Sequence, residues 1–498
     1  MKRVACGLAL LGFACAEPAV VWSPEPAVPE HPSLRLERIY ATRSATEILI
    51  GGFDGAAIGP APVGVERDGV RITQATPDAH GRFRIATPAV DGDWAITRAG
   101  EPTVGLRVRD PEVARAAALL EGLGGAGLTP NDLVIVGPKH APFGALVRSG
   151  DHAVSAIDLE QGLQPDSGRF LDRANPWFAA PVDPEGTEVV VSAYASGEVQ
   201  RLDLVNRARP PVIYRPGGPV ELAKAWPLLE PRDVDEDGTA EASVLRYPLI
   251  TPQPVLVLGG RIYAAYTGVI SVRLGSRGPV QLPPTLVSWA LDDPDNPRRT
   301  LLPFHNPQEL RALPDGRILV VASGVLDPRG DRVEVRTPGG VVVYDPMTDR
   351  VVERFDLADF GAGTAVLSEE SLWVGSLARP ILRRIPRFGS GDPTELLVND
   401  EEVDSIFRMI ELDGGLVAVP SFNTDRLHVL DLRTGQLNPP PFFEPFLVGP
   451  GRPVFSGLQV VARRPGRIGV DFTGPDLFLL FGPGSSITPL ELRKVMGP

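Results

Sequence analysis

The sequence predicts an all-β chain, in which a small β-sandwich precedes a β-propeller of about seven blades. A phrase of turn residues and short strands recurs through the C-terminal three quarters of the chain, which is typical of repeat folds. The predicted strands are short, β-branched and bounded by Gly, Pro and Asp. Glycine and proline number 53 each, which fits a chain that reverses direction often.

The recurring phrase predicts the extent of the propeller. Its two best copies begin at Asn175-Pro176 and Asn306-Pro307, and each continues into a Gly turn, a β-branched strand and a strand that ends in Asp. Weaker copies lie near residues 253–303, 361–398 and 457–492. The units average roughly 50 residues, within the range of propeller blades. We therefore expect a propeller over residues 130–498.

Four of the predicted strands end in an aspartate at a turn: Asp158, Asp203, Asp345 and Asp431. A carboxylate at such a position accepts hydrogen bonds from nearby backbone N–H groups. We expect these aspartates to form turns.

The first sixteen residues have the pattern of a signal peptide, with a positive start, an apolar run over residues 4–13 and small residues at 14–16. Two cleavages fit. A lipoprotein peptidase would cut before Cys15 and leave it for diacylation, whereas an ordinary signal peptidase would cut before Glu17. The segment from Leu11 to Cys15 resembles the bacterial lipobox, which favours lipidation. We expect an exported protein, either an envelope or outer-membrane lipoprotein or a periplasmic or secreted one.

Three further segments precede the propeller. Residues 17–34 are rich in proline and predict a semi-rigid polyproline II spacer. Residues 35–110 contain short strands separated by Gly, Asp and Pro turns, which predict the β-sandwich. Residues 111–129 predict a short helix, from Pro111 to Glu121, followed by a Gly-rich linker.

Both folded parts resemble known modules. The propeller unit, with Asn-Pro, a Gly turn and a strand ending in Leu-Asp, looks like the YVTN and NHL-like seven-bladed propellers of bacterial exported proteins. Residues 35–110, with a turn of Asp-x-x-Gly-x-Phe type at Asp78 to Phe83, resemble bacterial Ig-like or carboxypeptidase-regulatory-like domains. The first resemblance implies a scaffold, a binding module or an enzyme. The second implies a spacing or adhesion module.

One acidic loop has the spacing of a calcium site. Its expected ligands are Asp233, Asp235, Asp237, Thr239 through its carbonyl, and Glu241, with Gly238 at the sixth position. Alternate oxygen ligands and a glycine at the sixth position allow one loop to wrap a hard cation. The loop resembles those of dockerin, EF-hand and FG-GAP repeats, and Val244 at the twelfth position favours the FG-GAP type. We expect a structural Ca²⁺ here; the alternative is an acidic surface turn.

Four residues are candidates for ligand contact in the propeller funnel: Asn175, Trp177, His305 and Asn306. They stand where innermost strands are predicted to begin, and these strands surround the funnel. The six histidines of the chain show no metal-ligand spacing on a common element.

Composition and motifs exclude several function classes. The net charge is −13, so we expect no nucleic-acid partner. Cys6 and Cys15 are the only cysteines, so the folded part has no disulfide and no thiolate site. No nucleophile elbow, P-loop or dinucleotide fingerprint occurs.

Three functional hypotheses remain. The first is a noncatalytic exported scaffold that presents a propeller face to a protein or glycan partner and touches the membrane only through a lipid anchor. The second is a metal-dependent hydrolase or lactonase with its site in the funnel. The third is a structural element of the envelope that adheres through the sandwich.

Overall fold

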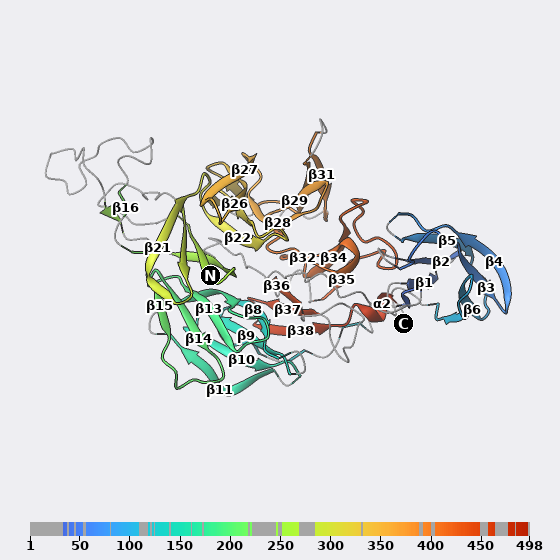
Figure 1. Cartoon of the computed structure of the whole chain (residues 1–498), viewed down its shortest axis with the longest axis horizontal. Helices are drawn as coiled ribbons and strands as arrows, with labels where there is room; N and C mark the ends of the chain where they lie inside the picture. The colour runs from blue at the N-terminus through green and yellow to red at the C-terminus, as the bar shows by residue number, and fades with distance from the viewer. Residues whose placement is uncertain are drawn as a thin grey trace, which may run out of the picture.

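The computed structural model describes residues 33–496 with gaps at 109–117, 222–245, 268–283, 449–456 and 464–476, and with shorter gaps of one to four residues. Nearly all of the regular secondary structure in the described chain is β-strand, and the fold is a β-propeller with a small N-terminal β-sandwich (Figure 1). No helix among the described residues is long and apolar enough to cross a membrane.

The β-sandwich consists of two antiparallel sheets that enclose one hydrophobic core. One sheet has the order β1 (Ile39–Arg43), β2 (Glu47–Gly52), β5 (Phe83–Pro88), and the other has the order β4 (Val70–Ala75), β3 (Val63–Arg67), β6 (Trp94–Arg98), β7 (Val104–Leu106). In β5, buried and exposed residues alternate, because successive side chains of a strand point to opposite faces. The predicted sandwich is confirmed, while its Ig-like character stays a prediction.

The propeller sheets follow one another along the chain, and in each the first strand lies at one edge of the sheet. The first four have the orders β8 (Pro130–Val136), β9 (Phe143–Arg148), β10 (Ala153–Asp158), β11 (Gly162–Phe170); β12 (Pro176–Pro181), β13 (Glu188–Ala193), β14 (Glu198–Asp203), β15 (Val212–Tyr214); β18 (Pro252–Leu258), β19 (Arg261–Tyr266), β20 (Thr285–Ala290), β21 (Asp293–Leu301); and β22 (Pro307–Ala312), β23 (Ile318–Ala322), β26 (Gly339–Asp345), β27 (Arg350–Leu357).

The next three sheets have the orders β28 (Ala362–Leu367), β29 (Ser371–Ser376), β30 (Ile381–Pro386), β31 (Thr394–Leu397); β32 (Ile410–Glu411), β33 (Leu416–Ser421), β34 (Arg426–Asp431), β35 (Phe446–Leu447); and β36 (Leu458–Arg463), β37 (Leu477–Phe481), β38 (Ser486–Leu490). Two hairpins and two short helical elements complete the described elements: β16 (Val220–Glu221) with β17 (Arg246–Tyr247), β24 (Leu326–Arg329) with β25 (Arg332–Val335), a 3-10 turn over Asp413–Gly415, and α2 (Arg493–Met496). The predicted number of blades stays a prediction.

The innermost strands form a closed circuit around the propeller axis. β8 packs against β12, β12 against β18, β18 against β22, and β22 against β28. The segment that leads into β32 continues the circuit, because the Met409 N–H donates to Thr364 Oγ1 of β28 over 3.0 Å. β32 then packs against β36, and β36 packs against β8.

The ring is closed by pairing a segment from before β8 with the last sheet. The Leu123 N–H donates to the Ile487 carbonyl over 2.8 Å, and the Ala126 N–H donates to the Ser485 carbonyl over 2.7 Å. Leu119 also bridges to Leu490. Residues of the predicted Gly-rich linker therefore run along the outer edge of β38, and closure of this kind removes an exposed sheet edge. Most of the predicted helix, from Pro111 to Glu121, lies outside the described residues.

The β-sandwich packs directly on the propeller through one face of β1 and β2. Tyr40 and Leu49 join a hydrophobic cluster with Leu412 and Phe442 of the propeller, and α2 contacts β1 (Figure 1). Burial raises the pKa of Tyr40 to about 12. The ring needs a glycine beside it, because a Cβ at Gly51 would lie 2.4 Å from Tyr40 Oη.

The four strand-ending aspartates form turns, as predicted. Asp158 Oδ1 accepts the Glu160 N–H over 2.7 Å, and Asp345 Oδ1 accepts the Met347 N–H over 2.9 Å. Asp431 Oδ1 accepts the Arg433 N–H over 2.9 Å. Asp203 makes the same kind of contact and is described with its surroundings below.

Acid is expected to destabilise the fold through His428 of β34. This side chain is 2% exposed, and its Nδ1 lies 3.3 Å from Asn438 Nδ2. Burial, with a smaller contribution from Arg426, lowers the pKa of His428 to about 3. An unfolded histidine titrates near 6.5, so below that pH the unfolded chain binds a proton that the folded chain does not. The contribution of neutral His428 to the free energy of unfolding is therefore complete above pH 6.5 and is lost as the pH falls towards 3.

We expect His428→Gln to flatten the pH dependence of stability between pH 6.5 and 4, because glutamine does not titrate. The change in slope should approach about 1.4 kcal/mol per pH unit, the value for one proton. Urea unfolding at several pH values in this range measures it. Parallel curves for the wild-type and variant proteins would contradict the assignment.

Candidate functional site at one end of the propeller axis

The innermost strands begin with the same backbone geometry in six of the described sheets. The residue before the strand has a positive φ: Thr129 (47°), Asn175 (44°), Thr251 (62°), Asn306 (57°), Gly361 (65°) and Gly457 (71°). Its carbonyl accepts an N–H at the end of the second strand, as Asn306 does from Ser323 over 3.1 Å. We call this residue with positive φ the corner. The asparagine of the recurring Asn-Pro phrase occupies it, because asparagine and glycine tolerate positive φ, whereas β-branched threonine is strained there.

The next feature of these strands is a β-bulge at their second residue. The pairing register shifts there in β8, β12, β18, β22, β28 and β36. Bulges redirect side chains and are common beside binding sites. We call the residues at this position the rim: Asn131, Trp177, Gln253, Gln308, Gly363, Phe407 and Gln459. Phe407 belongs to it because the Phe422 N–H donates to the Ser405 carbonyl in the same pattern.

Three rim residues pack over the residue that directly follows the second strand of their own sheet. Trp177 stacks on Tyr194 with ring centroids 4.8 Å apart and an interplanar angle of 25°. Phe407 meets Phe422 edge-on at 4.6 Å, and Gln308 Nε2 lies 3.5 Å from Ser323 Oγ. The rim therefore consists of amide and aromatic side chains, with one glycine at Gly363.

The residue after the rim position joins neighbouring sheets at the axis. Asp132 Oδ2 accepts the Ala179 N–H of β12 over 2.9 Å, and Glu309 Oε2 accepts the Ala365 N–H of β28 over 2.9 Å. Each carboxylate thus bonds the free backbone edge of the next innermost strand. The Thr364 hydroxyl also donates to Glu309 over 2.9 Å.

Two arginines extend past an intervening sheet to complete this polar layer. Arg408 Nη1 lies 3.1 Å from Asp132 Oδ1, although the residues are 276 positions apart, and both side chains are at most 2% exposed. Arg311 pairs with Glu309 over 2.7 Å and also donates to the Met409 carbonyl over 2.5 Å. The buried charges at the axis are therefore paired with each other and with the backbone.

The structure distributes the predicted funnel residues over two sheets. Asn175 is a partly exposed corner whose N–H donates to His152 Nδ1 over 3.1 Å, and Trp177 is a partly exposed rim residue. Asn306 is a buried corner whose Nδ2 donates to Ser323 Oγ over 2.8 Å. His305 precedes it, and burial lowers its pKa to about 4. Whether any of them contacts a ligand stays a prediction.

Sequence reasoning did not single out Asn131, Asp132, Gln253, Arg408 or Gln459. Thr129-Pro130 and Thr251-Pro252 occupy the positions of the two Asn-Pro phrases, so the shared proline could have revealed the first three. Arg408 gave no local signal, because its partner is distant in the sequence.

The predicted calcium ligands Asp233, Asp235, Asp237, Thr239 and Glu241 lie outside the described residues, as does Cys15. Among the residues that the structure describes, no three His, Cys, Asp or Glu side chains are grouped so that they could hold a metal ion.

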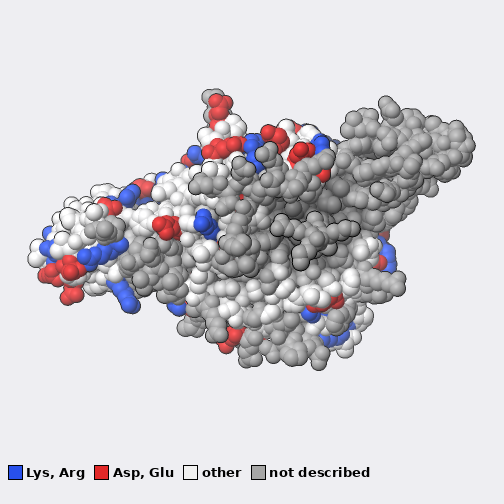
Figure 2. Space-filling view, turned by 180° about the vertical axis from the view of Figure 1, so that it is seen from behind, with Lys and Arg blue, Asp and Glu red and all other residues white. Residues whose placement is uncertain are grey.

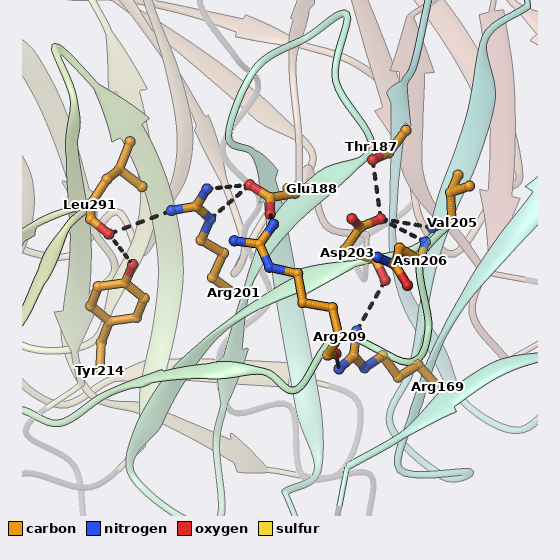
Figure 3. Close-up of polar contacts among 10 residues, drawn as sticks. All are labelled: Arg169, Thr187, Glu188, Arg201, Asp203, Val205, Asn206, Arg209, Tyr214 and Leu291. Carbon is orange, nitrogen blue, oxygen red and sulfur yellow. Dashed lines mark hydrogen bonds and ion pairs between the residues drawn. The ribbon is translucent and has the colours of Figure 1, made fainter.

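A second polar cluster lies at the opposite end of the sheet β12–β15 (Figure 3). Glu188 pairs with both Arg201 and Arg209, and the Tyr214 hydroxyl donates to the Leu291 carbonyl over 2.6 Å. Asp203 accepts N–H groups of Val205 and Asn206 and the Thr187 hydroxyl. Burial raises the pKa of Asp203, but these hydrogen bonds outweigh it and leave the pKa lowered. These contacts hold the turn that follows β14, and the bond from Tyr214 to Leu291 joins this sheet to the next one.

The outer surface shows no strong bias of charge on the face in Figure 2, where acidic and basic side chains of the described residues are interspersed. Among the described residues, oppositely charged side chains also pair at the surface, as Arg43 does with Asp91 in the sandwich.

Comparisons with known proteins give structural likeness only. No protein-family model and no curated protein sequence matches the chain. Similar solved structures include hydrazine synthase of Kuenenia stuttgartiensis (TM-score 0.49, 13% identity, 75% of this chain and 96% of that one) and the virginiamycin B lyase of Staphylococcus aureus (TM-score 0.42, 13% identity, 75% and 98%). The propeller domain of Swd1 from Myceliophthora thermophila has a TM-score of 0.43 at 15% identity, over 75% and 98%.

The buried pair between Asp132 and Arg408 is expected to be important for stability. Asp132→Ala should lower the free energy of unfolding by about 3–5 kcal/mol, because it leaves Arg408 buried without its carboxylate. Asp132→Ala combined with Arg408→Met should lose less than the single variant. Urea unfolding measures both.

Asp91→Ala is the matched control, because the Asp91 and Arg43 side chains are 88% and 44% exposed. Removal of an exposed pair should change stability by less than about 1 kcal/mol. If Asp132→Ala and Asp91→Ala lower the free energy of unfolding equally, the axial pair is no more important for stability than an exposed pair.

Proposed function

We propose that the chain is a noncatalytic exported scaffold, anchored by a lipid on Cys15, that presents a propeller face to a protein or glycan partner. One observation carries this proposal: the axial carboxylates of Asp132 and Glu309 bond backbone N–H groups and arginines, while the rim above them is neutral. Carboxylates held in this way serve structure, and neutral amides and aromatic rings serve recognition. Such a rim is suited to binding.

Two further features belong to the proposal. Calcium held by Asp233, Asp235, Asp237, Thr239 and Glu241 would serve as a structural ion, which the spacing of the oxygen ligands supports. The proline-rich spacer over residues 17–34 would hold the folded part away from the membrane. Together these features describe a tethered module with a free propeller face.

The alternative, a metal-dependent hydrolase or lactonase with its site in the funnel, can be tested directly. We expect the protein with Ca²⁺, Mg²⁺, Mn²⁺ or Zn²⁺ to hydrolyse p-nitrophenyl acetate and γ-butyrolactone no faster than the metal in buffer. Metal-dependent turnover that disappears in Glu309→Gln, while the variant keeps its circular dichroism spectrum, would replace the scaffold with the hydrolase.

Lipidation of Cys15 predicts partition into the detergent phase after Triton X-114 extraction of a bacterium that expresses the full chain. Cys15→Ser should move the protein to the aqueous phase, because an acyl chain supplies the membrane affinity. Cys6→Ser is the matched control and should leave the partition unchanged. A mature wild-type chain that begins at Glu17 by mass spectrometry would exclude the anchor.

A further inference from the structure

The rim residues differ in composition and exposure around the axis, and one arc of the rim has the composition of a binding surface. On the side of β28 and β32, Phe407 and Phe422 form an apolar cluster with Leu326 and Leu377, against which Val333 and Val335 of β25 pack. The hairpin β24–β25 therefore covers that aromatic pair. The other aromatic pair, Trp177 with Tyr194, is partly exposed.

Two unsatisfied amides stand on either side of Trp177. Asn131 is the rim residue of β8, and Gln253 is the rim residue of β18, and both strands pack against β12. Each side chain is 1% exposed. Asn131 Nδ2 and Gln253 Oε1 have no hydrogen-bond partner among the described residues, although buried polar atoms are almost always paired in native proteins.

Backbone contacts hold the start of β18, two residues before Gln253, against Tyr194, which directly follows the second strand of its sheet. The Thr251 N–H donates to the Tyr194 carbonyl over 3.2 Å, and the Tyr194 N–H donates to the Asn175 carbonyl over 3.1 Å. Thr251 is also held by a hydrogen bond of 2.7 Å between its Oγ1 and that of Thr267. A β-branched residue at φ 62° is strained, and strained backbone is concentrated at functional sites.

We propose that this arc, formed by Asn131, Trp177, Tyr194 and Gln253, binds a neutral saccharide, a class of ligand within the proposed scaffold function on which this inference rests. The stacked indole and phenol rings offer a flat apolar surface for the C–H face of a pyranose ring. An unpaired amide donor on one side and an unpaired amide acceptor on the other match the hydroxyl groups at its edge. The acidic and basic groups nearest the axis are paired, so the site offers no net charge to an ionic ligand.

The experiment is isothermal titration calorimetry of the full chain with cellotetraose, maltotetraose and tetra-N-acetylchitotetraose. We expect at least one of them to bind. Trp177→Ala and Gln253→Leu should each weaken that binding at least about tenfold, as loss of a central contact does. Trp177→Phe should retain part of the affinity because a ring remains.

Gln200→Leu in β14 is the matched control, because it removes another buried amide away from the rim, and it should change the affinity less than about twofold. Circular dichroism confirms that each variant is folded, and if Trp177→Ala does not fold, Trp177→Phe and Gln253→Leu decide. The inference is overturned if no saccharide binds, or if binding is equal in the rim variants and the control. In either case the scaffold proposal survives, since it also allows a protein partner and is tested separately by metal-dependent turnover and by the anchor on Cys15.

Discussion

The innermost strand of each propeller sheet has one edge without a neighbouring strand, and hydrogen bonding along this edge governs the rest of the structure. The strands at the axis are too far apart to form a sheet with each other, yet their N–H groups are buried. Asp132 and Glu309 solve this problem in the same way, each by accepting an N–H of the next strand. Thr364 accepts the Met409 N–H by the same geometry without a charge.

Those carboxylates bring a second requirement, because a buried negative charge needs a partner. Arg408 pairs with Asp132 across an intervening sheet, whereas Arg311 pairs with Glu309 on its own strand β22. Arg311 also donates to the Met409 carbonyl, so both arginines join sheets that are not neighbours in the ring. The same contacts occupy the axial carboxylates of Asp132 and Glu309 with backbone N–H groups and arginines.

Local pattern was enough to predict much of this architecture. Alternating short strands gave the fold class, and the terminal aspartates gave the turns, since both depend on residues close together in the sequence. Asn175 and Trp177 were found because Asn-Pro repeats. Arg408 was missed because its role is set by a residue on a distant strand, and Gln253 was missed because threonine replaced asparagine before the proline. Contacts between residues that are far apart in the sequence produce no repeating pattern from which they could be predicted.

Closure of the ring also depends on the order in which the chain is synthesised. The last sheet, β36–β38, lies near the end of the chain, and its outer edge pairs with Leu119, Leu123, Gly125 and Ala126 from before β8. No part of the ring can be sealed before the ribosome has finished almost the whole polypeptide. Until then the N-terminal sheets cannot close into a ring, because the sheet that completes it has not yet been made.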